Sequence, residues 1–183
     1  VITSWVAGAL IWKWVLSPEY GAINNILALF GIEGPSWLQS SKWAMPAIVL
    51  ASVWKDMGYF GLMLMSGLQG INQEYYDAAA IDGAGKIKQF TRITLPLLTP
   101  TLFFVLIISL INSFQLFTQI MIMTPDGGPL GSTMVMVERI YKCGFRYYEM
   151  GTAAAYSWIL FAILLLLTMV QMKLQNKWVN YDD

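Results

Sequence analysis

The sequence predicts an all-α fold, a polytopic bundle of transmembrane helices with about four spans. Of the 183 residues, 57% are hydrophobic and only 12% are charged, whereas an average soluble domain has about a quarter charged residues. Backbone that crosses lipid must satisfy its own hydrogen bonds, and long apolar runs without alternating polarity do so as helices. Eight tryptophans and nine tyrosines suit the two interfaces of a bilayer. We therefore expect membrane lipid to surround most of this chain.

Four apolar segments alternate with three polar connections, and we expect one transmembrane domain fragment over residues 1–183. The spans are predicted near residues 1–16, 44–68, 95–123 and 152–172. A spanning helix needs roughly 20 residues, and the first segment is shorter than that. The chain begins with Val1, already inside an apolar run. We therefore expect the sequence to be an N-terminally truncated part of a longer protein.

The composition argues against several classes of function. The chain has no histidine, one cysteine, and 11 basic residues that balance 11 acidic ones. Without histidine the commonest general base and metal ligand is missing, and a lone cysteine makes no internal disulfide or thiol metal cluster. A balanced charge offers no basic face to nucleic acid. We therefore expect no nucleic-acid partner, no metal site, no catalytic residues and no cofactor in this chain.

The connection at residues 69–94 carries the most informative pattern. Glu74–Ile81 is a good helix former, with acidic residues early, where the helix dipole favours them, and three alanines. Gly83 and a second glycine two residues later favour a break. Pro96 then opens the next apolar run, because proline is tolerated near a helix start. The pattern predicts a compact amphipathic helix between two spans, with a small-residue face that another protein could contact.

This stretch resembles the EAA signature of binding-protein-dependent ABC importer permeases. That signature combines an acidic residue, two alanines, a glycine and an Ile-x-Leu-Pro run, and this chain has them at the same spacing with aspartate in place of glutamate: Asp77, Ala78, Ala79, Gly83, Ile93, Leu95 and Pro96. The turn at Thr124–Pro129 is similar to that of the carbohydrate and glycerol-phosphate subfamily. The resemblance covers essentially the whole chain. It implies the type I importer permease fold, with two further N-terminal spans absent from this sequence.

The resemblance also implies that loop 69–94 is a cytoplasmic coupling loop that docks on a separate ATPase. The residues expected to take part are Glu74, Asp77, Ala78, Ala79, Gly83, Ile93, Leu95 and Pro96. The alternative is an ordinary surface helix between two spans. A Gly-x-Gly-Lys run within the loop looks like the end of a phosphate-binding P-loop, but Ala80 and Ile87 occupy positions that need glycine and a hydroxyl residue. ATP and Mg are therefore expected on the partner ATPase.

Polar side chains follow one side of two expected spans. A charge at bilayer depth is costly unless it faces protein or water, and helical geometry places these residues within arcs of roughly 100° and 160° in the two spans. We expect them to line a path for a small polar solute. The residues are Ser52, Lys55, Asp56, Tyr59, Ser109, Asn112, Ser113 and Gln115. The alternative is hydrogen bonding between helices.

These features predict the permease subunit of an ATP-driven ABC importer, which forms half of the path for a sugar or related carbohydrate. We do not expect the chain to be an enzyme. The implied partners are a second, homologous permease in a heterodimer, two ABC ATPase subunits and an extracytoplasmic solute-binding protein. The implied location is multi-pass in the cytoplasmic (inner) membrane of a bacterium or archaeon. Two alternatives stay open: a membrane-embedded enzyme that relies on carboxylates, and a passive channel subunit.

Overall fold

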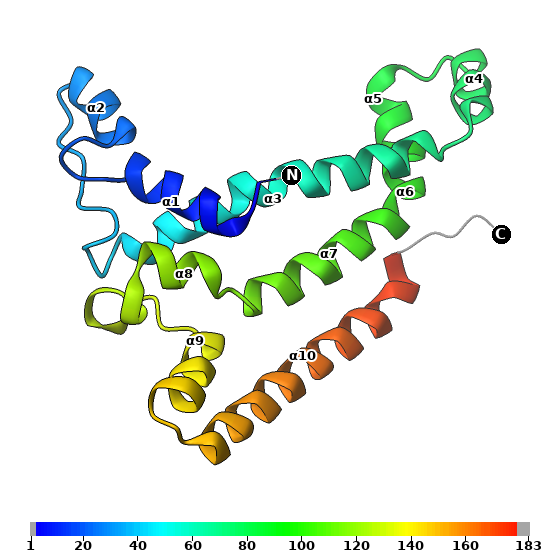
Figure 1. Cartoon of the computed structure of the whole chain (residues 1–183). Coiled ribbons are helices and arrows are strands. Elements are labelled where there is room, and N and C mark those ends of the chain that lie inside the picture. Colours follow the sequence, from blue (N-terminus) through cyan, green and yellow to red (C-terminus); the bar gives the residue numbers. More distant parts are fainter. Residues whose placement is uncertain (1–2, 179–183) are drawn as a thin grey trace. The chain divides into compact units, whose positions relative to one another are not determined.

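The computed structural model describes residues 3–178, with side chains through residue 175. Within residues 3–178 every regular element is a helix (Figure 1). The chain forms two compact units. The first consists of the residues up to Met57 together with Ser113–Ala162, and the second consists of Gly58–Asn112 together with the chain from Ile163 onward. The long helices α3 (Ala44–Gln69) and α10 (Met150–Trp178) each contribute to both.

The core of the first unit lies where α1 (Trp5–Val15) and α8 (Thr118–Met123) pack with the first half of α3. α1 packs closely against α8, and small buried residues of α1 and α3 contribute to the same core. The buried apolar side chains are Ala9, Leu16, Ala47, Ile48, Ala51, Ile120 and Met123. Figure 1 shows α2 (Ala22–Leu29) next to the end of α1.

A compact turn follows α8 in the first unit. It contains the short helices η2 (Pro125–Gly127) and η3 (Pro129–Gly131). The Thr133 hydroxyl donates to Thr124 Oγ1 at 2.9 Å, and the Thr133 N–H donates to the Gly127 carbonyl, also at 2.9 Å. The predicted turn at this position is confirmed. The chain then forms α9 (Met136–Tyr141) and η4 (Lys142–Arg146) before α10 begins.

The second unit contains the predicted coupling loop. After α3 come α4 (Gln73–Ile81), α5 (Lys86–Gln89), the π-helical turn η1 (Phe90–Thr94), α6 (Leu95–Leu97) and α7 (Thr99–Phe114). The end of α3 and the start of α7 come very close at Gly67. An added Cβ there would lie 2.5 Å from Thr101 Oγ1. The glycine is therefore what permits this close approach of the two helices.

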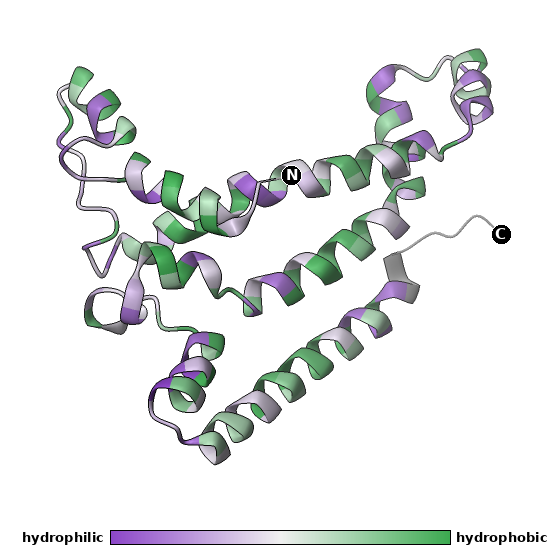
Figure 2. Ribbon diagram, viewed as in Figure 1, coloured by the Kyte–Doolittle hydropathy of each residue, from purple (hydrophilic) through white to green (hydrophobic). Residues whose placement is uncertain are grey.

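Two described helices, α3 and α10, are long and apolar enough to cross a membrane, and the bent pair Lys86–Leu97 and Thr99–Phe114 would be a third span. Figure 2 shows the hydrophobic colour along α7 and α10. Large apolar side chains on these helices are exposed, among them Leu166 at 58%, as expected for a surface in contact with lipid. The fourth expected span, near 1–16, is the 11-residue α1, and its first two residues lie outside the described residues.

The sequence predicted one continuous helix over the apolar stretch 95–123, and the structure differs. The stretch consists of α6, α7 and α8, and residues 115–117 between the last two are not helical. The break after α7 has no proline or glycine to cause it. Its cause is packing: Gln119 and Ile120 of α8 are buried in the first unit.

Candidate functional site

The predicted coupling helix is present as α4. The side chain of Asn72 caps its start, because Asn72 Oδ1 accepts a hydrogen bond from the Glu74 N–H at 3.1 Å. Such a cap stabilises a helix by about 1 kcal/mol. The Glu74 carboxylate lies in the first turn, where the helix dipole favours negative charge. The prediction of a helix over Glu74–Ile81 is confirmed.

Gly83 ends α4 in the left-handed conformation, with φ of +70°. The Gly83 N–H donates to the Ala80 carbonyl at 3.0 Å, and the Ala84 N–H donates to the Ala79 carbonyl at 2.9 Å. This pair of bonds is a Schellman motif, which satisfies carbonyls at the end of a helix. Because glycine adopts positive φ without steric cost, the predicted break at Gly83 has a defined backbone reason.

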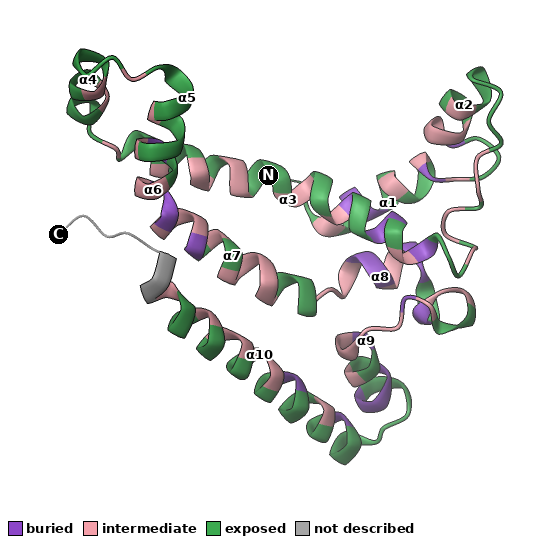
Figure 3. Cartoon of the chain, turned by 180° about the vertical axis from the view of Figure 1, so that it is seen from behind, coloured by how far each residue is buried: buried purple, intermediate pink, exposed green. Residues whose placement is uncertain are grey.

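The predicted coupling residues of α4 form a largely exposed face made of small and acidic side chains. Glu74, Asp77 and Ala78 are exposed and Ala79 is half-buried. Figure 3 shows α4 and α5 mostly in the colour of exposed residues. Small side chains allow a second surface to approach the helix backbone closely. The contact of these residues with an ATPase remains a prediction.

A tether that the sequence analysis did not identify joins α4 to the end of η1. The Tyr76 hydroxyl and Thr94 Oγ1 form a hydrogen bond at 2.8 Å. Thr94 is only 8% exposed and Tyr76 is half-buried, and a hydrogen bond contributes about 1 kcal/mol net. The tether holds the exposed helix against the segment that leads into α6 and α7.

We expect Tyr76→Phe to weaken the connection between α4 and the following helices. Loss of about 1 kcal/mol lowers the equilibrium constant for the tethered arrangement about fivefold. The protection of the α4 amides against hydrogen exchange is expected to fall by a similar factor in the full-length protein. Tyr75→Phe is the matched control, because Tyr75 is exposed. Equal loss in both variants would contradict the role of Tyr76.

The other predicted coupling residues lie in a bent helical segment. Ile93 belongs to η1, and Leu95 and Pro96 belong to α6. The Leu95 N–H donates to the carbonyl of Phe90, five residues back, which is the π-helical pattern. Pro96 follows directly and has no N–H to donate. Pro100 likewise cannot donate to the Pro96 carbonyl, and the Thr99 hydroxyl does so at 2.6 Å. The helices before and after this point meet at 61°.

Of the pathway residues predicted in α3, Lys55 has the clearest contact. Its ammonium lies 4.6 Å from the centroid of the Trp5 ring, a cation–π contact within the first unit. Such a contact partly compensates a charge that is removed from water. Asp56 is half-buried, and Ser52 Oγ is buried without a hydrogen-bond partner among the described residues. Tyr59 belongs to the second unit, where its ring contacts Phe60.

The pathway residues predicted in 95–123 do not all share one helix. Ser109, Asn112 and Ser113 are in α7, and the Ser109 hydroxyl donates to the Leu106 carbonyl at 3.0 Å. Gln115 is in the non-helical segment between α7 and α8, so the helical arc predicted for it was wrong. The role of all these residues in a solute path remains a prediction.

An ionic cluster in the first unit joins the turn that follows α8 to the helices α9 and η4. Lys142 Nζ lies 3.1 Å from Glu138 Oε1 and 3.5 Å from Asp126 Oδ1, and Arg146 also contacts Asp126. Glu138 is fully buried, so the buried Lys142 ammonium compensates its charge. This cluster was not predicted from the sequence.

Low pH is expected to loosen this turn through Asp126. The hydrogen bond from Arg146, and then its charge, hold the pKa of the Asp126 carboxyl below its ordinary value of 3.8. A lowered folded-state pKa stabilises the fold above pH 3.8, and this stabilisation is lost as the pH falls through the folded-state pKa. The measurement is amide hydrogen exchange of residues 124–133 between pH 5 and pH 3. Asp126→Asn, which tolerates the positive φ at this position, is expected to remove the pH dependence; an unchanged profile would contradict the assignment.

Within residues 3–178 no three His, Cys, Asp or Glu side chains come together to hold a metal ion. The all-helical architecture, the apolar spans and the exposed loop helix between two of them define a polytopic membrane component of the permease type. Residues 3–181 match the family described as binding-protein-dependent transport system inner membrane component. The chain belongs to this family, which confirms the resemblance drawn from the EAA-like spacing. The family consists of transport components, in agreement with the prediction that the chain is not an enzyme.

Curated relatives are transport permeases of bacteria. The chain is 35% identical over 185 residues to the probable ABC transporter permease protein YesP of Bacillus subtilis, covering 100% of this chain and 59% of the relative. It is 38% identical over 165 residues to the sulfoquinovosyl glycerol transport system permease protein SmoG of Agrobacterium fabrum, covering 90% and 53%. It is 36% identical over 174 residues to the sn-glycerol-3-phosphate transport system permease protein UgpA of Shigella flexneri, covering 95% and 59%. The chain thus spans less than two thirds of the length of these relatives.

A solved structure shares the fold. The crystal structure of a bacterial alginate ABC transporter in complex with alginate pentasaccharide-bound periplasmic protein matches with a TM-score of 0.86 at 24% identity. The match covers 96% of this chain and 61% of that chain. The predicted fold class, an all-α permease of the ABC importer type, is confirmed.

Proposed function

We propose that this chain is part of a permease subunit of an ATP-driven ABC importer. It forms half of the translocation path for a small polar solute, a sugar or related carbohydrate, and couples to a separate ATPase through loop 69–94. The observation that carries this proposal is the geometry of α4, a capped helix between two spans that exposes small side chains and ends at the left-handed Gly83. The relatives, all named as permeases of transport systems, support it.

The proposal includes partners that supply what this chain does not. Two ABC ATPase subunits bind ATP and Mg, a homologous second permease forms the other half of the path, and an extracytoplasmic solute-binding protein delivers the solute. The solved alginate transporter contains such a periplasmic protein, which supports this kind of partner. The family name supports a place in the bacterial inner membrane. The solute path is proposed to use Ser52, Lys55, Asp56, Tyr59, Ser109, Asn112, Ser113 and Gln115.

Cysteine cross-linking tests the proposal. Ala78→Cys places a thiol on the exposed face of α4, and Asn25→Cys places one on α2, which a single crossing of α3 separates from α4. In the full-length permease with Cys143→Ser, Ala78→Cys is expected to cross-link to the ATPase and to react only from the cytoplasmic side. Asn25→Cys is expected to react only from outside and to give no such cross-link.

The opposite result would overturn the proposal. If the thiol at position 78 reacts from outside, or never cross-links to the ATPase in an active complex, α4 is not the coupling helix. Solute flux that continues without ATP in sealed vesicles would favour the passive channel instead.

A further inference from the structure

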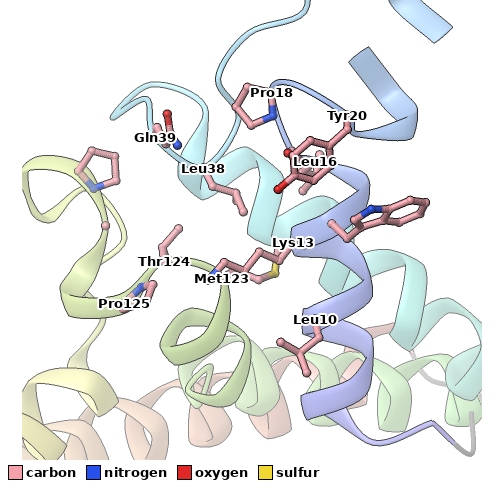
Figure 4. Close-up of a pocket in the computed structure, with 14 residues that line it drawn as sticks. Leu10, Lys13, Leu16, Pro18, Tyr20, Leu38, Gln39, Met123, Thr124 and Pro125 are labelled. Carbon is pink, nitrogen blue, oxygen red and sulfur yellow. The ribbon is translucent and has the colours of Figure 1, made fainter. Parts of the chain in front are cut away.

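An open cavity of about 710 Å³ lies in the first unit, between the C-terminal end of α1, the connection before α3 and the turn after α8 (Figure 4). Its volume is within the range of small-molecule sites, roughly 300–1,000 Å³. The wall is mostly apolar, with Leu10, Leu38 and Met123 among its side chains. Such sites combine an apolar wall with a few placed polar groups.

The polar groups of this cavity include one cation. Lys13 is the single charged residue in the lining, and Figure 4 shows its side chain directed from α1 toward Met123. No ion pair joins Lys13 to a carboxylate within the described part of the chain. The acid of the turn after α8, Asp126, is paired with Lys142 and Arg146. Among the described residues, the positive charge of Lys13 at the cavity is thus not offset by an ion pair.

The other polar groups suit a hydroxylated ligand. Figure 4 shows the Tyr20 hydroxyl directed toward the hollow and the Gln39 side chain at its rim. Tyr20 and Trp14 of the lining are 61% and 57% exposed, so their rings are open to contact with the C–H face of a sugar. A hydroxyl, an amide and aromatic rings around one ammonium are the groups that a sugar acid or polyol phosphate would require.

The order of the elements along the chain relates the cavity to the single crossing made by α3. The cavity walls come from residues before α3 and after α8, whereas α4 follows α3 and precedes the helices that lead back to α8. If α4 is cytoplasmic, as the proposed function requires, the cavity faces the side from which the solute arrives.

We propose that this cavity binds a small polyhydroxylated anion before it enters the translocation path. Its carboxylate, sulfonate or phosphate group contacts Lys13, and its hydroxyls contact Tyr20 and Gln39. This inference rests on the proposed function for the direction of transport, but its test does not require ATP hydrolysis.

Thiol labelling with reagents of opposite charge tests the positive charge. Gln39→Cys is made in the full-length permease with Cys143→Ser, in membrane vesicles, and labelled with sulfonatoethyl and trimethylammonioethyl methanethiosulfonate. The ratio of the anionic to the cationic labelling rate at position 39 is expected to be raised severalfold by the positive charge, and Lys13→Gln is expected to remove this increase. Ser36→Cys, at an exposed position outside the lining, is the control, and its ratio is expected not to respond to Lys13→Gln. An unchanged ratio at position 39 would overturn the proposal.

Protection from labelling tests the ligand class. Glucuronate and glycerol 3-phosphate are compared with glucose and glycerol at equal concentration and ionic strength. At least one anion is expected to slow labelling of position 39 severalfold, with neither neutral compound doing so, and the protection is expected to disappear with Lys13→Gln. Equal effects of anions and neutral compounds, or none, would overturn the assignment, whereas failure of the ATPase cross-link alone would overturn only the proposed function.

Discussion

Given the proposed coupling role of α4, replacing Gly83 with valine is expected to lower solute uptake by the full-length permease at least about tenfold. Gly83 has a φ of +70°, and the left-handed conformation costs an L-residue roughly 1–2 kcal/mol, more for a β-branched side chain. The strain would break the bonds from Gly83 and Ala84 to α4 and displace the exposed face. A shift of about 1.4 kcal/mol is already tenfold in population.

The loop offers matched controls for this substitution. Gly83→Asn is expected to retain much of the uptake, because asparagine tolerates the left-handed region. Gly85→Ala is expected to be nearly neutral, since Gly85 has a φ of −65° and open space around an added Cβ. The measurements are solute uptake, solute-stimulated ATP hydrolysis and the amount of permease in the membrane. Normal uptake by Gly83→Val, or equal loss in Gly83→Asn, would contradict the backbone argument.

Loop 69–94 shows what local sequence can predict. The end of α4 at Gly83 was predicted from a break residue in the local sequence, whereas the Asn72 cap at its start was not identified there, although asparagine is a common cap residue. The Tyr76–Thr94 tether joins residues 18 positions apart, and nothing in the local pattern distinguishes Tyr76 from Tyr75. Which of the two tyrosines bonds to Thr94 depends on where the fold places η1.

The span at 95–123 shows where a hydrophobic run misleads. Pro96 and Pro100 were available as signals for the bend at the start of α7, and the structure has a 61° angle there. The second break, at Gln115, has no such signal, because residues 112–118 are all compatible with a helix. It follows from packing of Ile120 into a core shared with α1 and α3.

Charged residues at depth show the same limit. The rule that a membrane-embedded charge needs a partner predicted that Lys55 would not face lipid. It could not identify Trp5, which lies 50 positions away in the sequence and whose ring makes a cation–π contact with the Lys55 ammonium. The buried pair Glu138 and Lys142 is four residues apart on one helical face, so its spacing was a usable signal.

Replacing Gly67 with leucine is expected to destabilise the second unit by at least about 2 kcal/mol, by analogy with overpacked cores. An added Cβ at Gly67 would lie 2.5 Å from Thr101 Oγ1 and 2.9 Å from both Thr101 Cβ and Leu98 Cδ1. Thr101 Cβ is attached directly to the backbone, so rotation of a side chain cannot relieve the contact. The end of α3 and the start of α7 must move apart.

Gly61 provides the matched control for this prediction. It lies on the same helix, and nothing lies within 4 Å of its added Cβ, so Gly61→Leu is expected to be neutral or slightly stabilising through helix propensity. Stability is measured by detergent-induced unfolding of the purified full-length permease. A double-mutant cycle of Gly67→Ala with Thr101→Ala should show that removal of the threonine hydroxyl and methyl recovers part of the loss. Equal behaviour of the two glycines would mean that α3 and α7 do not approach each other at Gly67.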